Sequence, residues 1–223
     1  MERIPEPELM DADDQAAAYA NADFEEPNQR FVDTFAARFG APQGWILDLG
    51  CGPADIPLRL ARGYPDVYVR AVDGAPAMLA RAQAARAEEA PAVAARVKLH
   101  ESILQGLDLS EASYDAVISN SLLHHLHDPA PFWTAVCRFG RPGAGVLIMD
   151  LARPEGAAQA QAIVDTYAAS EPAVLRQDFY NSLFAAFTVD EVRGQLDDAG
   201  LQGLHVAMAS DRHWIVSGWL PEG

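Results

Sequence analysis

Residues 45–56 read Trp45-Ile-Leu-Asp-Leu-Gly-Cys-Gly-Pro-Ala-Asp-Ile56, and this stretch decides the fold. Trp45–Leu49 predicts a short buried strand, Gly50 and Gly52 predict a tight turn, and Asp55–Arg62 predicts a helix. The two glycines permit positive φ angles and let a ligand approach the backbone closely. The free N–H groups at the helix start face the crevice beyond the strand end. A nucleotide, a phosphate or another nucleoside fits such a turn.

The chain after residue 44 alternates short apolar runs with longer amphipathic runs. Further strands are predicted over Val67–Asp73, Val97–His100, Tyr114–Ser119 and Gly145–Leu151. Further helices are predicted over Pro76–Glu89 and Ala130–Phe139. Apolar strands separated by helices favour βαβ crossovers and a mostly parallel sheet with helices on both faces. The expected fold class is therefore α/β.

The C-terminal third departs from this alternation of strands and helices. Residues 154–187 read as a long Ala-rich helix followed by LRQDFYNSLF, which we interpret as a helical insertion. A helix over Val189–Ala199, capped by Thr188 or Asp190, precedes two strands near Leu204–Ala209 and His213–Leu220. Two strands joined by a short connection predict an antiparallel hairpin at the sheet edge.

Composition excludes several classes of protein. The 223 residues, 50% hydrophobic, suffice for one core. The net charge of −16 repels phosphate backbones and anionic membranes, so neither nucleic acid nor a membrane is expected as a partner. The sequence has no apolar run long enough to span a bilayer and no signal-peptide layout at its start, and its two cysteines, Cys51 and Cys137, fit a reducing compartment. We expect a cytoplasmic protein.

The first 43 residues form a separate, acidic segment. A helix is expected from Asp11 or Asp13, and a second over Asn28–Phe39, which carries phenylalanines at i, i+4 and i+8. Two interpretations stay open. The segment is either a helical lid that carries Tyr19 and Phe24 over a site, or a solvated appendage packed on the core. The expected domains are residues 1–43, the lid segment, and residues 44–223, the main domain with the insertion.

Two details of the glycine turn indicate which ligand it takes. The dinucleotide fingerprint needs a small residue where this chain has Asp55, and no P-loop motif occurs in the sequence. Asp48, just before the turn, would repel a pyrophosphate but suits the amino group of an amino-acid moiety. NAD is therefore disfavoured.

A second acidic residue ends the next predicted strand. Asp73 can accept hydrogen bonds from both hydroxyls of a ribose, as acids at this place do in nucleoside sites. Gly74 leaves room for a flat base, and Met78 is a candidate apolar wall. The alternative for Asp73 is a helix N-cap for Pro76–Glu89.

Three segments together resemble the class I S-adenosylmethionine-dependent methyltransferases. They are ILDLGCGPADIPLRLA (46–61), AVDGAPAMLARAQ (71–83) and YDAVISNSLLHHLHDP (114–129), and the likeness covers residues 44–151. Their motifs are similar to those of the small-molecule methyltransferases of ubiquinone and menaquinone biosynthesis. The resemblance implies a Rossmann-like seven-stranded sheet of order 3-2-1-4-5-7-6 with strand 7 antiparallel. It also implies S-adenosyl-L-methionine as the cofactor.

The same resemblance implies which residues hold the cofactor. Asp48 and the Gly50-Cys51-Gly52 turn would line its methionine end, and Asp73 would hold the ribose. The expected cofactor residues are Asp48, Gly50, Cys51, Gly52, Asp73, Gly74, Met78, Ser102, Ile103, Ser119 and Asn120. This chain departs from the family after the third strand, where relatives carry an acid for the adenine amino group. Glu101 is not a clean match, which leaves Ser102 or a backbone group for that contact.

The histidines of LHHLHDP invite comparison with a metal site. We expect none, because His124 and His125 would point in different directions on a regular element and no Cys or carboxylate set completes four ligands. His125 is expected to bond backbone beneath the cofactor, and Asp128 to cap the next helix. His124 is the better candidate to face a methyl acceptor.

The expected reaction is methyl transfer to a small-molecule acceptor by in-line displacement. Candidate catalytic residues are His124, Tyr19 and Tyr180; Phe24, Arg153 and Asp178–Asn181 are further candidates for the acceptor side. Asn120 is followed by Ser-Leu-Leu, unlike the Pro-Pro-aromatic motif of enzymes that methylate amide or adenine nitrogens. The alternative functions are a catalytically altered cofactor- or nucleoside-binding protein, or another group transfer from the same cofactor. Whether the chain is a monomer or a homodimer stays open.

Overall fold

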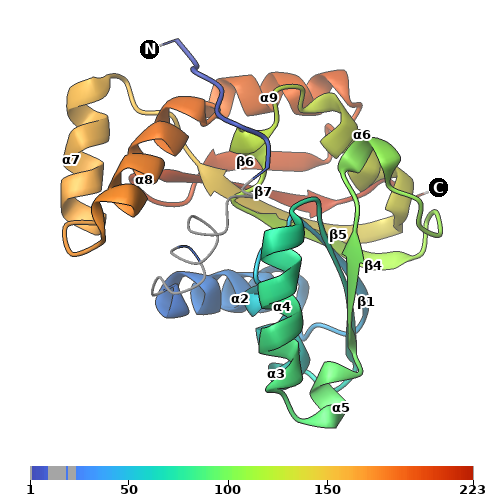
Figure 1. Cartoon of the computed structure of the whole chain (residues 1–223). Helices are drawn as coiled ribbons and strands as arrows, with labels where there is room; N and C mark the ends of the chain where they lie inside the picture. Colours follow the sequence, from blue (N-terminus) through green and yellow to red (C-terminus); the bar gives the residue numbers. More distant parts are fainter. Residues whose placement is uncertain (1, 10–18, 20–23, 223) are drawn as a thin grey trace.

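The computed structural model describes residues 2–9, 19 and 24–222, and its centre is one seven-stranded sheet (Figure 1). The strand order is β3-β2-β1-β4-β5-β7-β6. The strands are β1 (Gly44–Leu49), β2 (Val67–Asp73), β3 (Val97–Glu101), β4 (Tyr114–Asn120), β5 (Gly140–Leu151), β6 (Leu204–Met208) and β7 (His213–Trp219). β1 to β5 pair in parallel, and β7 runs antiparallel to both β5 and β6. The predicted order and the antiparallel terminal hairpin are confirmed.

Alternating residues along the central strands face two different helix layers. Ile46 packs with Phe31 and Leu58 on one face of the sheet. Its neighbour Leu47 packs with Trp133 on the other face. Because both faces are covered, the strands are apolar on both sides, which is why they read as continuous apolar runs in the sequence.

The helices that cover these faces follow the predicted segments closely, with one exception. They are α2 (Glu25–Phe39), α3 (Asp55–Gly63), α4 (Pro76–Ala87) and α5 (Pro91–Ala94) on one side, and α6 (Ala130–Phe139) and α9 (Val189–Asp198) on the other. The exception is the short α5, which was not predicted. Thr188 begins α9 with a complete capping box to Glu191. Two short 3-10 helices, η1 (Leu104–Gly106) and η2 (Leu123–His125), follow β3 and β4.

The segment expected as an insertion forms two helices, α7 (Ala157–Tyr167) and α8 (Ala173–Ala185), at one end of the sheet (Figure 1). They share a small core with the end of β5, in which Leu151, Ile163 and Leu183 are buried. The helix expected from Asp11 or Asp13 falls outside the described residues. α2, in contrast, buries three side chains in the main core and so packs as part of the domain.

Across the described parts of the chain, no helix combines the length and the apolar character that a membrane crossing requires.

Candidate functional site

The glycine turn after β1 wraps around the end of β2. The backbone N–H groups of Gly50 and Cys51 both donate to the Val72 carbonyl, at 2.8 and 2.9 Å. Gly50 has a φ of +77°, and a Cβ at this position would lie 2.8 Å from the Leu122 side chain. Gly52 has a φ of +52° and open space beside it. The turn therefore needs glycine at both positions, and at Gly52 it leaves backbone open to a ligand.

The Asp73 carboxylate joins this turn to the loop after β2. Its Oδ2 accepts a hydrogen bond from the Gly52 N–H at 2.7 Å, and its Oδ1 accepts one from the Ala75 N–H at 2.9 Å. Burial raises the pKa of Asp73, and these backbone N–H groups act against the rise. The alternative of a helix cap is wrong, because the N-cap of α4 is Ala75 and has no side-chain hydrogen bond.

Asp48 lies on β1 just before the turn. Its side chain is buried, yet it borders the cavity described below. Burial, with a smaller contribution from the charge of Asp73, raises its pKa to about 8. A buried carboxyl group of this kind favours a cationic partner, which would let it ionise.

A cavity of about 1480 Å³ opens beyond the ends of β1, β2 and β4. Single ligand sites are commonly about 300–1,000 Å³, so this volume accommodates two molecules side by side. Ten of the eleven expected cofactor residues line it: Asp48, Gly50, Cys51, Gly52, Asp73, Gly74, Met78, Ser102, Ile103 and Asn120. The structure thus brings together residues from the ends of β1, β2 and β4 and from the segments that follow β1, β2 and β3.

Ser119 is the exception, and the expectation that it lies under the cofactor is wrong. Its side chain is buried inside the sheet, and its hydroxyl donates to the Leu49 carbonyl at 2.7 Å. It holds β4 to β1 and does not border the cavity. Glu101 is exposed and does not border the cavity either, whereas Ser102 and Ile103 do.

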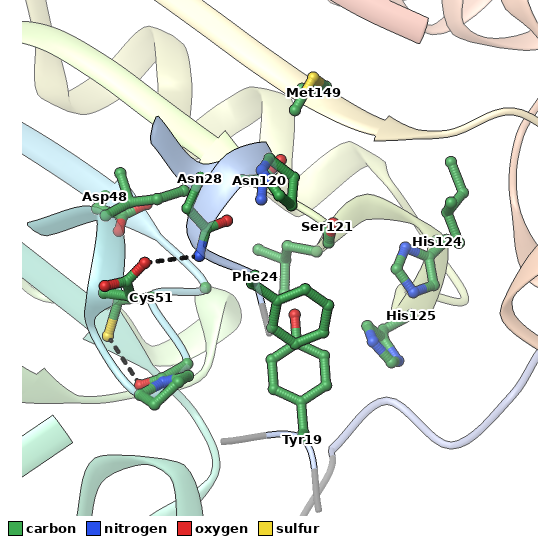
Figure 2. Close-up of a pocket in the computed structure, with 18 of the residues that line it drawn as sticks. Tyr19, Phe24, Asn28, Asp48, Cys51, Asn120, Ser121, His124, His125 and Met149 are labelled. Atoms are coloured by element: carbon green, nitrogen blue, oxygen red, sulfur yellow. Dashed lines mark hydrogen bonds between the residues drawn. The ribbon is translucent and has the colours of Figure 1, made fainter. Parts of the chain in front are cut away.

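Aromatic residues stand between the two ends of the cavity. Figure 2 shows Tyr19 and Phe24 between Asp48 and Cys51 on one side and His124 and His125 on the other. The Tyr19 and Phe24 rings lie 4.8 Å apart. Burial, with the charges of nearby acids, raises the pKa of Tyr19 to about 12, so its hydroxyl stays protonated at neutral pH.

The expected acceptor residues of the 154–187 segment separate into two groups. Asp178 and Phe179 border the cavity. Tyr180 instead packs on Phe184 and the small core of α7 and α8, so its expected place at the site is wrong. Arg153 lies 2.5 Å from Glu191 and also donates to a backbone carbonyl, which holds it away from the cavity.

His124 and Asp150 form a buried pair at the opposite end of the cavity. The backbone N–H of His124 donates to Asp150 Oδ2 at 3.0 Å, and its ring Nδ1 lies 2.5 Å from Asp150 Oδ1. Burial acts to lower the pKa of His124, but the Asp150 carboxylate outweighs burial and the pKa is raised. Burial acts to raise the pKa of Asp150, and His124 holds it below its usual range.

Glu6, from the N-terminal segment, completes this cluster. Its Oε1 lies 3.5 Å from His124 Nε2 and 3.2 Å from His125 Nδ1, and it accepts a hydrogen bond from the Ser182 hydroxyl at 3.0 Å. The two imidazole rings are 4.1 Å apart and both face this carboxylate. The expectation that the two rings point in different directions is therefore wrong, because η2 places them side by side. Glu6, which comes from elsewhere in the chain, adds one carboxylate to the two imidazoles.

The segment that carries Glu6 is anchored by its own contacts. The Arg3 guanidinium donates to the carbonyls of Ala185, His124 and Leu126, at 2.5 to 2.8 Å, and lies 3.9 Å from the centre of the Phe187 ring. The His127 N–H donates to Glu8 at 2.9 Å. Residues 3–8 thus pack against the η2 region.

Sequence reasoning missed three residues of this cluster. Asp150 ends a strand as Asp48 and Asp73 do, so the same signal could have identified it. Glu6 and Arg3 carry no local signal, because their partners lie more than 110 residues away in the chain.

The chain is similar in sequence to known methyltransferases. Residues 46–143 match a family of methyltransferase domains. An uncharacterized methyltransferase of Mycobacterium tuberculosis is 38% identical over 113 residues, which are 49% of this chain and 51% of the relative. A ubiquinone biosynthesis O-methyltransferase of Xanthomonas campestris is 31% identical over 126 residues, 56% of this chain and 51% of that protein. The chain therefore spans about half the length of these curated relatives.

A solved structure has the same fold over almost the whole chain. It is that of a SAM-dependent methyltransferase from Aquifex aeolicus, with a TM-score of 0.67 and 17% sequence identity. The match covers 94% of this chain and 98% of that structure. At this identity the likeness concerns the fold.

Proposed function

We propose that the chain is a class I S-adenosylmethionine-dependent methyltransferase that transfers the methyl group of this cofactor to a small-molecule acceptor. The order of its strands and the match of residues 46–143 to a family of methyltransferase domains support this proposal. The fold that the resemblance implied is confirmed. The sequence matches to methyltransferases support the family and, with it, the cofactor. The acceptor and the roles of individual residues are proposals.

The polar groups of the cavity fit the cofactor. The Asn120 Oδ1 atom is buried and has no hydrogen-bond partner among the described residues, although Asn120 borders the cavity. Asp48 is a buried carboxyl group suited to a cationic amino group. Burying either group without a partner costs free energy, so both favour a polar ligand. When bound, the cofactor supplies a methyl group on a positively charged sulfur.

We assign the following roles to the chain's own residues. Asp48 binds the amino group of the cofactor, and Asp73 accepts hydrogen bonds from its ribose. Gly52 lets the ligand approach the backbone. Asn120 supplies a polar contact between the two halves of the cavity, and Met78 supplies an apolar wall for the base.

The remaining half of the cavity is assigned to the acceptor. Tyr19 and Phe24 exclude water from the place where the two molecules would meet, and Phe179 extends the apolar wall. Holding two reactants in line contributes up to about 7–11 kcal/mol in well-oriented systems, so positioning supplies most of the acceleration. His124, fixed by Asp150, is the polar group that would face the acceptor.

A small molecule is supported over a polymer by two observations. The cavity is bordered by Glu8 and Leu9 of the N-terminal segment and by α8, and we expect these to limit access for a chain-like substrate. The net charge of −16 opposes a nucleic acid.

The observation that carries the proposal is the cavity bordered at one end by Asp48 and Asp73 and at the other by His124. The test incubates the protein with S-adenosylmethionine bearing a labelled methyl group and a panel of phenols, thiols and amines, and measures S-adenosylhomocysteine and labelled product. We expect product with at least one class of acceptor. Cofactor binding without any turnover would instead favour the alternative of a binding protein. An unlabelled product that carries a different group, with the label left on the thioether by-product, would favour another group transfer.

A further inference from the structure

Three potential metal-ligating atoms converge at the acceptor end of the cavity. They are Glu6 Oε1, His124 Nε2 and His125 Nδ1, and all lie within 4.8 Å of one another. The two distances to the glutamate oxygen are 3.5 and 3.2 Å. Zinc bonds of about 2.0–2.1 Å in a tetrahedral site place ligand atoms about 3.3 Å apart, so the spacing is that of a metal site.

Each imidazole ring turns one nitrogen toward this point. His124 uses Nδ1 for the Asp150 carboxylate, which leaves Nε2 directed at Glu6. His125 Nδ1 is buried, lies 3.2 Å from Glu6 Oε1 and has no hydrogen-bond partner among the described residues.

Metal-ligating histidines characteristically donate their second ring N–H to a carboxylate or a backbone carbonyl, which fixes the tautomer and directs the lone pair. His124 shows this arrangement, because its Nδ1 lies 2.5 Å from Asp150 Oδ1. One oxygen of Glu6 and one nitrogen of each ring face a common point, where the carboxylates of Glu6 and Asp150 would stabilise a cation.

We propose that Glu6, His124 and His125 bind a divalent first-row transition-metal ion at the acceptor end of the cavity. Two imidazole nitrogens and one carboxylate oxygen are a ligand set that such ions accept. Three protein ligands leave at least one coordination position open, as in catalytic zinc sites. His124 and His125 border the cavity, so the open position faces the acceptor.

The strongest competing explanation is that Glu6 only anchors the N-terminal segment. The segment is already anchored on both sides of Glu6. Arg3, before it, donates to three backbone carbonyls, and Glu8, after it, accepts from the His127 N–H. Anchoring therefore does not require a buried carboxylate between two histidines. A metal-binding role accounts for its position.

The use of the ion rests on the proposed function. An ion here would bind an oxygen or nitrogen of the acceptor directly and favour its deprotonated, nucleophilic form. The acceptor class that this site would take is therefore one with an ionisable donor atom, such as a phenol or an enol. Metal binding itself can be tested without any acceptor.

The test titrates Zn²⁺ into the full-length protein, freed of metal by chelator and desalting, and measures heat of binding and stoichiometry. We expect one Zn²⁺ per chain. Co²⁺ should give visible absorption bands that Zn²⁺ displaces. Glu6→Gln and His125→Ala are each expected to weaken Zn²⁺ binding by more than about tenfold, because losing an outer-shell partner already costs about 10–100-fold.

Two matched variants control for charge and histidine content. Glu2→Gln makes the same change on the same segment at an exposed position, and His205→Ala removes an exposed histidine on β6. Both should bind Zn²⁺ like the wild type. Circular dichroism and binding of S-adenosylhomocysteine establish that Glu6→Gln remains folded.

The proposal is overturned if the wild type fails to bind Zn²⁺ and Co²⁺, or if Glu6→Gln binds Zn²⁺ as tightly as the wild type. Failure of the methyl-transfer proposal would look different. In that case Zn²⁺ would bind as described, but S-adenosylhomocysteine would not bind to the wild type.

Discussion

The Gly52 N–H donates to Asp73 Oδ2 at 2.7 Å, and this contact joins the loops that follow the two central strands β1 and β2. Asp73, which we expect to bind the ribose of the cofactor, therefore also holds the glycine turn, which we expect to bind its amino-acid part. The two ends of the proposed cofactor site are therefore coupled. A substitution of Asp73 should therefore weaken binding of both parts of the cofactor.

We predict that Asp73→Ala weakens binding of S-adenosylhomocysteine by at least about tenfold, because hydrogen bonds to a charged group contribute about 1.5–3 kcal/mol each. Isothermal titration calorimetry measures the change. Asp66→Ala, an exposed aspartate just before β2, serves as the control and should bind normally. An Asp73→Ala protein that is folded and binds with wild-type affinity would refute the ribose role.

Proton release on cofactor binding is predicted from Asp48. Since burial raises its pKa to about 8, the carboxyl group is mostly protonated at neutral pH in the free protein. Pairing with a cationic amino group favours the ionised form, so binding should release a proton near pH 7. Calorimetry in buffers of different ionisation enthalpy measures this release, and Asp48→Asn should abolish it. Equal release by the variant and the wild type would assign the proton to another group.

Asp48 should also make the free energy of unfolding depend on pH. The pKa of Asp48 is higher in the folded than in the unfolded chain, so the folded state binds the extra proton between about pH 4 and pH 8. Its contribution to the free energy of unfolding is present in full below this window and is lost as the pH rises through it. Urea unfolding of Asp48→Asn should therefore show a flatter decline from pH 5 to pH 8 than the wild type. Parallel profiles would contradict this assignment.

The two turn glycines should respond differently to alanine. Gly50→Ala combines a left-handed backbone, costing about 1–2 kcal/mol, with a Cβ 2.8 Å from Leu122, where overpacking costs about 1–3 kcal/mol more. Gly52→Ala incurs the backbone cost alone, because nothing lies beside it. Urea unfolding should rank Gly50→Ala as the less stable variant, whereas calorimetry should show that Gly52→Ala, although folded, binds the cofactor product weakly. The opposite order of stability would contradict the contact between Gly50 and Leu122 as its cause.

Arg3 should stabilise the packing of residues 2–9 against the rest of the protein. Arg3→Ala removes three charged hydrogen bonds to backbone carbonyls, and we expect a loss of about 1.5–3 kcal/mol in unfolding free energy and faster amide exchange in residues 124–126. Arg30→Ala, which removes an exposed ion pair with Glu26, should change stability by less than about 1 kcal/mol. Unchanged exchange in Arg3→Ala would show that the segment does not protect η2.

Much of the fold was readable from short-range patterns. Apolar runs such as Val67–Asp73, with Gly or Pro at their ends, identified the strands, and the glycine turn with Asp48 and Asp73 identified the cofactor end. These features depend on neighbours within one element or one loop, where backbone conformation and side-chain periodicity act directly.

Ser119 and Tyr180 show where such reasoning fails. Both stand in segments near the site, but whether a side chain points into a cavity depends on the twist of its strand or the rotation of its helix against neighbours. Ser119 bonds the adjacent strand, and Tyr180 faces the α7 and α8 core.

Local patterns along the chain were sufficient for the strands, the glycine turn and the two acidic strand ends, because each is encoded by residues close together in sequence. The sheet order was predicted only through the family resemblance that these motifs carry. The meeting of Glu6 with His124, His125 and Asp150 needed the folded chain. Glu6 lies more than 110 residues away from the other three along the chain. The four residues meet because residues 2–9 pack on η2 and because β4 pairs with β5. No local preference of the backbone specifies a contact of that range, since it arises only when separate elements bury their surfaces against each other.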